Sequence, residues 1–213
     1  MPRGIAPART RTTYRHGDLR RALVDAGIEL ARDGGPEAIV LREATRRAGV
    51  VPNAAYRHFA GRDELLEAVR TAALAALAHA MVARLRRVPR TDDQVAFAHA
   101  NLRAIGSAYV AFAQKEPGLF RTAFAGAAPR RETVAVGKER GRAGPFQLLG
   151  AALDLLVLAH ALPPERRSGA EYLAWSAVHG LSMLIIDGPL RGMSRGERAA
   201  VTRAVLQMVE NGL

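Results

Sequence analysis

The sequence contains no cysteine, few aromatic residues and no long uninterrupted apolar run. Without cysteine it has no disulfide framework, no thiol chemistry and no cysteine-ligated metal. Its most apolar stretches, 72–83 and 148–162, are interrupted by His79 and by Asp154 and His160. Neither reaches the roughly 18 apolar residues of a membrane span, and the first 21 residues lack the apolar core of a secretory signal. These absences predict a cytoplasmic protein with no membrane partner.

Signals for β-strands are also missing. Aromatic residues make up 5% of the chain, runs of β-branched residues are absent, and no segment alternates cleanly between apolar and polar residues. The hydrophobic share of 49%, mostly alanine and leucine, is large enough to bury a core, which excludes an intrinsically disordered chain. The composition therefore predicts an all-α fold.

The positive charge is concentrated at the N-terminal end. The chain carries a net charge of +11, and residues 1–62 hold 12 basic and 6 acidic side chains against 19 and 14 in residues 63–213. The first 21 residues contain six arginines: Arg3, Arg9, Arg11, Arg15, Arg20 and Arg21. A basic arm of this kind suits a polyanion such as DNA. Because 29 of the 31 basic residues are arginine, genome composition is an alternative explanation, and charge alone leaves the question open.

The spacing of apolar residues predicts about nine helices. They cover about 18–32, 41–48, 52–59, 63–87, 95–116, 119–124, 146–162, 170–187 and 194–211. Residues 126–144, rich in glycine, proline and charge, are expected to form a mobile loop. Within 41–59, two short helices are separated by Gly49, which permits a sharp corner. That spacing is typical of a helix-turn-helix, in which the second helix enters the major groove of DNA.

The residues around this pattern resemble a known family. The strings A-G-V at 48–50, Y-R-H-F at 56–59 and R-D-E-L at 62–65 lie within a segment, 16–69, that resembles the N-terminal domain of TetR/AcrR-type transcriptional regulators. W-x-x-x-H-G at 175–180 is similar to a signature of one C-terminal subgroup of that family, as is the string at 102–124.

The resemblance implies an N-terminal three-helix DNA-binding domain with a basic arm, residues 1–62, and a C-terminal helical bundle for ligand binding and dimerisation, residues 63–213. Such regulators are homodimers, since two half-sites about 34 Å apart are needed for useful affinity. The last two helices are expected to pair with those of a second copy. The alternative is that they close a monomeric core.

The resemblance also assigns roles in DNA binding. Residues expected to face base edges are Arg42, Pro52, Asn53, Tyr56 and Arg57. Expected phosphate contacts are Tyr56, His58 and Arg62. Asparagine can pair with adenine and arginine with guanine, whereas phosphate contacts fix the register. Simpler interpretations remain: a half-buried core position for Tyr56, a surface position for His58, and solvated charges for Arg42 and Arg57.

The same helices should be seated by apolar residues. Val50, Ala55 and Phe59 are expected to pack on Leu23, Ala26 and Leu41. The sequence departs from the family at three positions, because Val40 and Val51 replace the usual capping hydroxyls and Ala54 replaces a common phosphate-binding hydroxyl. Each missing cap should cost about 1 kcal/mol of helix-start stability.

The C-terminal half offers candidates for a ligand pocket and for the dimer interface. Expected pocket residues, mostly apolar, are Met81, Phe97, Asn101, Tyr109, Phe112, Phe146 and Leu149, which suggest an uncharged or amphipathic small molecule. Most apolar helical residues are plain core, which is the alternative for each of them. Expected dimer residues are Trp175, Ser176, His179, Gly180, Val201, Val205 and Met208.

Neither a metal, a cofactor nor an enzymatic activity is expected. His79, His99, His160 and His179 lack the spacing and carboxylate partner of a metal site, and the chain contains no nucleophile-elbow, P-loop or dinucleotide-binding string. The sequence thus predicts a sequence-specific regulator, a repressor that a small-molecule effector releases from a palindromic operator. Two alternatives stay open: a helical ligand-binding or catalytic protein that has lost DNA binding, and a protein that coats DNA without sequence preference.

Overall fold

The computed structural model describes residues 16–126 and 143–213, and within these ranges all regular structure is helical. This confirms the predicted all-α fold. The basic side chains of Arg3, Arg9, Arg11 and Arg15 and residues 127–142 of the predicted loop lie outside the described residues. The α-helices are α1 (His16–Gly34), α2 (Leu41–Ala48), α3 (Pro52–Ala55), α4 (Arg62–Leu85), α5 (Gln94–Lys115), α6 (Pro117–Phe124), α7 (Pro145–Leu158), α8 (Ala170–Ile186) and α9 (Arg195–Gly212). Three short 3₁₀ turns, η1 (Pro36–Ala38), η2 (Pro164–Arg166) and η3 (Pro189–Gly192), lie between them.

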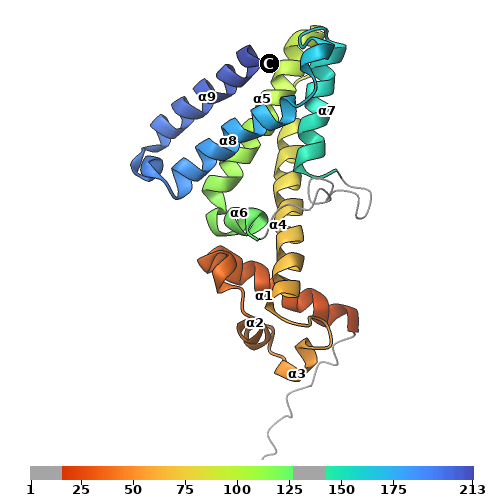
Figure 1. Cartoon of the computed structure of the whole chain (residues 1–213), viewed down its shortest axis with the longest axis vertical. Helices are drawn as coiled ribbons and strands as arrows, with labels where there is room; N and C mark the ends of the chain where they lie inside the picture. Colours follow the sequence, from red (N-terminus) through yellow and green to blue (C-terminus); the bar gives the residue numbers. More distant parts are fainter. Residues whose placement is uncertain (1–15, 127–142) are drawn as a thin grey trace, which may run out of the picture.

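The molecule is elongated, with α1–α3 at one end and the larger bundle of α5–α9 at the other (Figure 1). Helix α4 runs through both parts. Its first turns bury Leu65 and Val69 against α1, and its later turns bury Leu77 and Met81 in the C-terminal bundle. The predicted domain boundary at residue 62 coincides with the first residue of α4. Although α4 follows this boundary, its side chains contribute to the cores of both parts.

Helix α4 is long and apolar enough to cross a membrane by length and composition alone. The core helix of a soluble protein passes the same test, and the inward apolar side chains of α4 are buried in this chain's own core. Of the most apolar stretch of α4, 39% is buried in this way.

Two predicted helices end earlier in the structure than expected. Helix α3 stops at Ala55 rather than at residue 59, and the chain continues through a turn in which the amide groups of His58 and Phe59 both donate to the carbonyl of Ala55. Helix α7 ends at Leu158 rather than near 162. There His160 takes a left-handed conformation, φ 57°, and the Ala161 amide donates back to the carbonyl of Leu156, which closes the helix.

Helix α6 lies directly against α1, where the two parts of the molecule meet. At Gly118, a Cβ atom would lie 2.1 Å from the carbonyl oxygen of Ala31 and 2.8 Å from that of Arg32. Backbone atoms cannot rotate away as a flexible side chain can, so only glycine permits this approach. The ion pair between Arg32 and Glu116, 3.0 Å, lies beside the same contact.

We expect Gly118→Ala to lower the free energy of unfolding by about 1–3 kcal/mol, because the new methyl group must push α6 away from the α1 backbone. The measurement is urea unfolding at fixed protein concentration, and Gly150→Ala is the matched control. Gly150 is also helical, but its added Cβ meets only ordinary contacts at 3.5 Å or more, so this variant should be neutral or slightly more stable. Equal effects of the two substitutions would contradict the proposed close contact.

Candidate functional site

The corner between α2 and α3 depends on Gly49. This residue has φ 68° and ψ 29°, in the left-handed region where a side chain is disfavoured. Its amide donates to the carbonyl of Arg46, 3.3 Å, and the amide of Val50 donates to that of Thr45, 3.0 Å. These bonds close α2 and turn the chain into α3, so the helix-turn-helix predicted for 41–59 is present.

Both short helices begin without a side-chain cap, as predicted. Val40 precedes α2 and Val51 precedes α3, each in an extended conformation and with no side-chain hydrogen bond to the helix start. In contrast, Ser194 caps α9 by accepting from the amide of Glu197, whose carboxylate accepts from the amide of Ser194. The starts of α2 and α3 therefore depend on packing rather than on capping.

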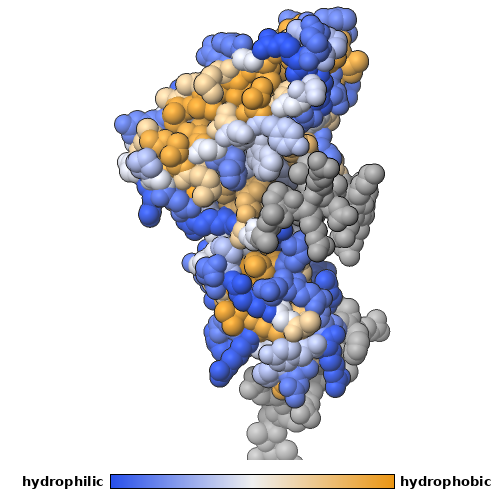
Figure 2. Space-filling view, in the orientation of Figure 1, coloured by the Kyte–Doolittle hydropathy of each residue, from blue (hydrophilic) through white to orange (hydrophobic). Residues whose placement is uncertain are grey.

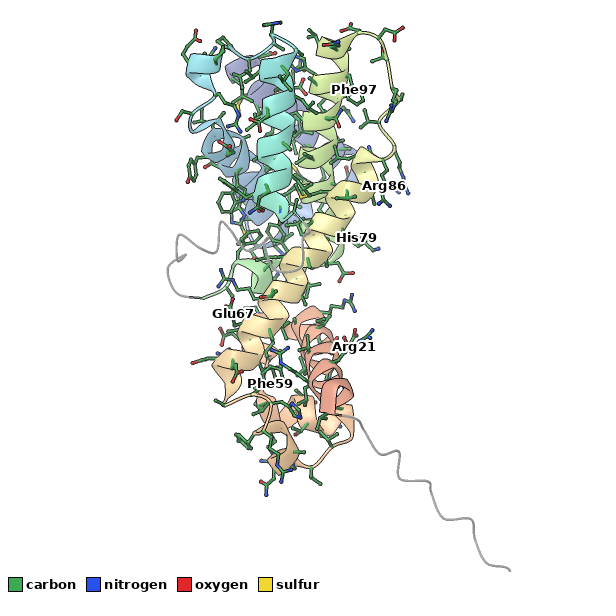
Figure 3. The ribbon with its side chains drawn as sticks, turned by 90° about the vertical axis from the view of Figure 1, so that its right-hand side faces the viewer. Arg21, Phe59, Glu67, His79, Arg86 and Phe97 are labelled. Carbon is green, nitrogen blue, oxygen red and sulfur yellow. The ribbon has the colours of Figure 1, made fainter. Side chains whose placement is uncertain are left out.

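The inner side of α3 is held by the three-helix core. Ala55 and Phe59 are fully buried, in the same core as Leu23, Ala26 and Leu41, and Val50 packs against it. The guanidinium of Arg20 lies 5.0 Å from the centre of the Phe59 ring, in cation–π geometry. Figure 3 shows Phe59 between the first helices of the chain. The predicted seat of the helix-turn-helix is confirmed.

The outer side of α3 and of the turn that follows it faces solvent. Pro52, Asn53, Tyr56 and Arg57 are all exposed. Tyr56 is 61% exposed, which excludes the alternative of a half-buried core aromatic residue in this chain. The residues expected to face bases are therefore accessible, on a segment whose opposite side is rigidly packed.

The arginines of this region fall into two groups. Arg42 and Arg57 are exposed, and neither guanidinium makes a hydrogen bond or ion pair within the part of the chain that the structure describes. Arg46 donates two hydrogen bonds to Glu43, and Arg47 pairs with Asp33. The hydrogen bonds from Arg46 hold the pKa of Glu43 at about 2, well below its usual range. Arg42 and Arg57 are thus available to a polyanion, whereas Arg46 and Arg47 are already neutralised.

Arg62 has a structural partner. Its guanidinium donates to the carbonyl oxygen of Pro36, 3.0 Å, and pairs with Glu37 at 3.3 Å, which ties the start of α4 to η1. His58 is half-buried. The phosphate contacts expected of Arg62 and His58 remain predictions. To bind a phosphate, Arg62 would have to keep or give up its bonds to Pro36 and Glu37.

A cavity of about 380 Å³ opens in the C-terminal bundle, lined from α4, α5, α6, α7, α8 and α9. Four of the predicted pocket residues line it: Met81, Tyr109, Phe146 and Leu149. Its wall is mainly apolar, with a few polar groups, as is typical of a small-molecule site.

The other three predicted pocket residues, Phe97, Asn101 and Phe112, do not line this cavity. Phe97 lies near the end of α5 furthest from α1–α3 (Figure 3). The amide of Asn101 donates to the carbonyl of Phe97 in its own helix, 2.8 Å, and Phe112 is buried in the core. Helix α5 is buried around much of its circumference, so its apolar spacing could not distinguish the cavity side from plain core.

Trp175 and His179 also lie at the cavity, while their predicted place at a dimer interface stays a prediction. Both were expected at the dimer interface, but both line the cavity of their own chain. The indole Nε1–H of Trp175 donates to the Tyr109 hydroxyl, 2.9 Å, and that hydroxyl lies 2.8 Å from Nδ1 of His179. Their spacing of four residues correctly put them on one face of α8, but that face turns inward, because Tyr109 of α5 engages both.

The other predicted dimer residues also lie on α8 and α9, and one of them, Ser176, lines the cavity as Trp175 and His179 do. Ser176, Gly180 and Met208 are exposed, and a Cβ added at Gly180 would meet no atom within 4 Å. Val201 and Val205 are half-buried against the chain's own core. Figure 2 shows apolar surface over this pair of helices, which includes the exposed side chains of Leu173, Leu184 and Met208.

Sequence reasoning did not place Arg70, Phe124, Trp175 and His179 in the cavity wall. For two of them the sequence contained a usable signal, because the W-x-x-x-H-G string places Trp175 and His179 on one face of a helix. Arg70 bridges α4 and α6 by donating to the carbonyl of Ala123, 3.3 Å, and to the carboxylate of Glu67, 3.1 Å.

In this chain the second helix of a helix-turn-helix is exposed on a packed three-helix domain, and that domain is joined to a helical bundle with an internal cavity. This arrangement is typical of one-component helix-turn-helix regulators, in which one polypeptide carries both the DNA-binding and the ligand-binding part. Residues 23–69 match the family "Bacterial regulatory proteins, tetR family", and residues 102–209 match "Tetracyclin repressor-like, C-terminal domain". Together they cover both parts of the molecule. The chain belongs to the TetR family of transcription regulators, whose members are DNA-binding proteins rather than enzymes.

One curated relative matches the N-terminal segment, and two solved structures share the fold. An "Uncharacterized HTH-type transcriptional regulator" of Haemophilus influenzae is 47% identical over 57 residues, which are 26% of this chain and 28% of that protein. The matched segment thus spans little more than a quarter of this curated relative. A solved protein of unknown function from Rhodococcus sp. RHA1 has the same fold, with a TM-score of 0.74, 24% identity, and coverage of 95% of this chain and 99% of that one. A putative TetR-family regulator from Shewanella sp. PV-4 superposes with a TM-score of 0.64 at 16% identity, over 91% of this chain and 97% of that one.

Restoring a cap at α3 should stabilise the protein. Val51 already has the extended conformation of an N-cap residue and is 69% exposed, so a serine there can accept a hydrogen bond without loss of core packing. We expect Val51→Ser to raise the free energy of unfolding by about 0.5–2 kcal/mol in chemical denaturation. Val51→Ala, which shortens the side chain but offers no acceptor, is the control and should show no such gain.

Proposed function

We propose that this protein is a sequence-specific repressor that binds a palindromic DNA operator as a homodimer and leaves it when a small molecule occupies the cavity. The observation that carries the proposal is the exposed side of residues 52–57, where Asn53 and Arg57 are accessible and Arg57 has no ion-pair partner among the described residues. The buried Ala55 and Phe59 fix this segment from behind. The protein acts in the cytoplasm and uses neither a metal nor a cofactor.

Direct base contacts are the proposed role of the exposed residues. Asn53 pairs with adenine and Arg57 with guanine in the major groove, each worth roughly 1–3 kcal/mol of discrimination. Arg42, also unpaired, reaches the groove from the start of α2. Pro52 and Tyr56 complete the surface presented to the bases, while Tyr56, His58 and Arg62 hold phosphates and fix the register.

A second copy of the chain supplies the second recognition helix. The outer face of α8 and α9 fits this role, because Gly180 leaves open space in front of α8 and exposed apolar side chains surround it. Packing of these helices against their symmetry mates would place two α3 segments about 34 Å apart, one turn of DNA.

The contact between α6 and α1 supports a physical route from cavity to DNA. Phe124 and Ala123 of α6 line the cavity, and Gly118 of the same helix touches the backbone of α1. A ligand that shifts α6 must therefore move α1 or break this contact. Only a difference in ligand affinity between the two positions is required, equivalent to a coupling of roughly 1–3 kcal/mol.

The decisive experiment is a mobility-shift titration of the purified chain with the DNA that flanks its own gene, in the presence of excess unrelated DNA. Retention of a discrete complex supports a sequence-specific regulator. Displacement by unrelated DNA at equal concentration would favour a protein that coats DNA without preference, and no complex at all would favour a ligand-binding protein without DNA binding. Affinity for the operator should fall steeply as the salt concentration rises.

We expect Arg57→Ala to relax specificity at one base position and to lower the binding free energy for the intact site by roughly 1–3 kcal/mol. On a site in which that base pair is changed, the variant and the wild type should bind equally well. Arg62→Ala should weaken binding to all sequences alike. The measurement is a competition series with single base-pair variants of the site. Arg86→Ala, at the end of α4 away from α3 (Figure 3), is the control and should leave binding unchanged. Identical profiles for Arg57→Ala and Arg62→Ala would contradict the division into base and phosphate contacts.

We expect Gly180→Arg to convert the dimer to a monomer, because it fills the open space in front of α8 with a long charged side chain. Sedimentation velocity at micromolar concentration measures the change, and operator affinity should fall with it. Ala151→Arg, at an exposed position of α7, adds the same charge elsewhere and should leave the dimer intact. A wild-type chain that sediments as a monomer would refute the proposed interface.

A further inference from the structure

Three polar side chains meet at the wall of the cavity and form what we call the polar triad: Trp175 and His179 of α8 and Tyr109 of α5. Tyr109 is 3% exposed, and its hydroxyl contacts both partners, at 2.9 Å from the indole nitrogen and 2.8 Å from Nδ1 of the imidazole. Trp175 and His179 belong to the W-x-x-x-H-G string, and DNA binding by α1–α3 gives no reason for either residue.

The donors in the triad can be assigned from chemistry. An indole nitrogen only donates, so the Tyr109 oxygen accepts from Trp175. Among the described residues the Tyr109 hydroxyl has no other acceptor than Nδ1 of His179, and leaving a buried hydroxyl proton unpaired is costly. The indole proton of Trp175 and the hydroxyl proton of Tyr109 are both paired only if Tyr109 donates its hydroxyl proton to Nδ1 of His179. The proton of a neutral His179 is then on Nε2, which no described residue accepts from.

Burial lowers the pKa of His179, which favours the neutral ring at neutral pH. The ring is also fixed in orientation, because it stacks on Phe120 with centroids 5.6 Å apart and meets the edge of Phe124 at 4.8 Å. A single neutral N–H donor is thereby held at the cavity wall in one tautomer.

Aromatic rings surround the triad. Six of the eleven Phe, Tyr and Trp residues in the chain belong to one network of ring contacts: Tyr109, Phe120, Phe124, Phe146, Tyr172 and Trp175. Phe146 meets Trp175 edge to face at 5.9 Å, and both line the cavity. Ring walls of this kind favour another flat ring through stacked and edge-to-face contacts.

The cavity offers no free cation among its described lining residues. Arg70 is engaged by Glu67 and by the carbonyl of Ala123, and Arg103 is paired with Glu210 at 2.8 Å. A carboxylate ligand would therefore lose its hydration without gaining an ion pair. The described lining therefore disfavours an anionic ligand.

We propose that the polar triad is the recognition point of the cavity, and that the ligand is an uncharged aromatic molecule whose oxygen accepts a hydrogen bond from His179 Nε2–H. The inference rests on the proposed function only in that it calls this ligand the effector. Trp175 and Tyr109 act as positioning residues, because they fix the tautomer of His179 rather than provide the donor.

The triad can be tested without a ligand, in the full-length ¹⁵N-labelled protein. Trp175 is the single tryptophan of the chain, so its indole N–H gives one signal. The imidazole ¹⁵N shifts of His179, identified by their loss in His179→Phe, should show a proton on Nε2 and none on Nδ1 at neutral pH. Tyr109→Phe should shift the indole signal and abolish the preference for one tautomer. A proton on Nδ1, or an unchanged tautomer in Tyr109→Phe, would overturn the assignment.

Ligand chemistry is tested with three probes: acetophenone, isopropylbenzene, which has nearly the same shape but no acceptor, and benzoate, which is charged. Binding is followed by the shift of the Trp175 indole signal. Because apolar transfer differs between the probes, the informative quantity is the ratio of the acetophenone and isopropylbenzene dissociation constants. In His179→Phe the dissociation constant of acetophenone should rise about tenfold relative to that of isopropylbenzene, which is the size of one net hydrogen bond. His79→Phe, an exposed position on α4, is the matched control and should leave the ratio unchanged.

Each outcome decides the proposal. An unchanged ratio in a folded His179→Phe, tighter binding of benzoate than of acetophenone, or no shift of the Trp175 signal by acetophenone would overturn it. If His179→Phe does not fold, Tyr109→Phe serves instead, since it keeps the ring and should lower the same preference. None of these measurements uses DNA, so a chain that binds acetophenone through His179 but ignores operator DNA would refute the proposed function and leave this inference standing.

Discussion

The burial of α4 at both of its ends is the constraint on which the rest of the structure depends. Leu65 and Val69 are fully buried in the core of α1–α3, and Leu77 and Met81 are buried in the C-terminal bundle. A helix of 24 residues is about 36 Å long, so one rigid element connects the helix-turn-helix to the cavity. Neither part can change its orientation relative to α4 without exposing large apolar side chains to water.

The contact between α1 and α6 is the second link between the two parts, and it is of a different kind. At Gly118 the chain brings two backbones together, with the Arg32–Glu116 ion pair beside them. Such a contact has little freedom to adjust. The same short helix carries Phe124 into the cavity wall, so the packing that defines the ligand site also defines the position of α1.

The cavity shows why helical spacing has limits as a guide to function. Phe97, Asn101, Tyr109 and Phe112 were all expected from α5 to line a pocket, yet only Tyr109 of these reaches the cavity, since this helix is buried on several sides. For α8, the spacing of Trp175 and His179 placed them on one face but gave no information about which neighbour that face meets. The hydrogen bonds of Tyr109 settle that they face inward.

The sequence by itself determined the features that depend on a few neighbouring residues. These are the all-helical composition, the corner at Gly49, the missing caps at Val40 and Val51, and the inward positions of Ala55 and Phe59. They are local because turn geometry, capping and helical periodicity act over three or four residues. Only the tertiary structure decided which face of α8 is internal, which arginines of the helix-turn-helix are free, and which aromatic rings meet. Those outcomes depend on residues far apart in the chain, whose pairing no local pattern encodes.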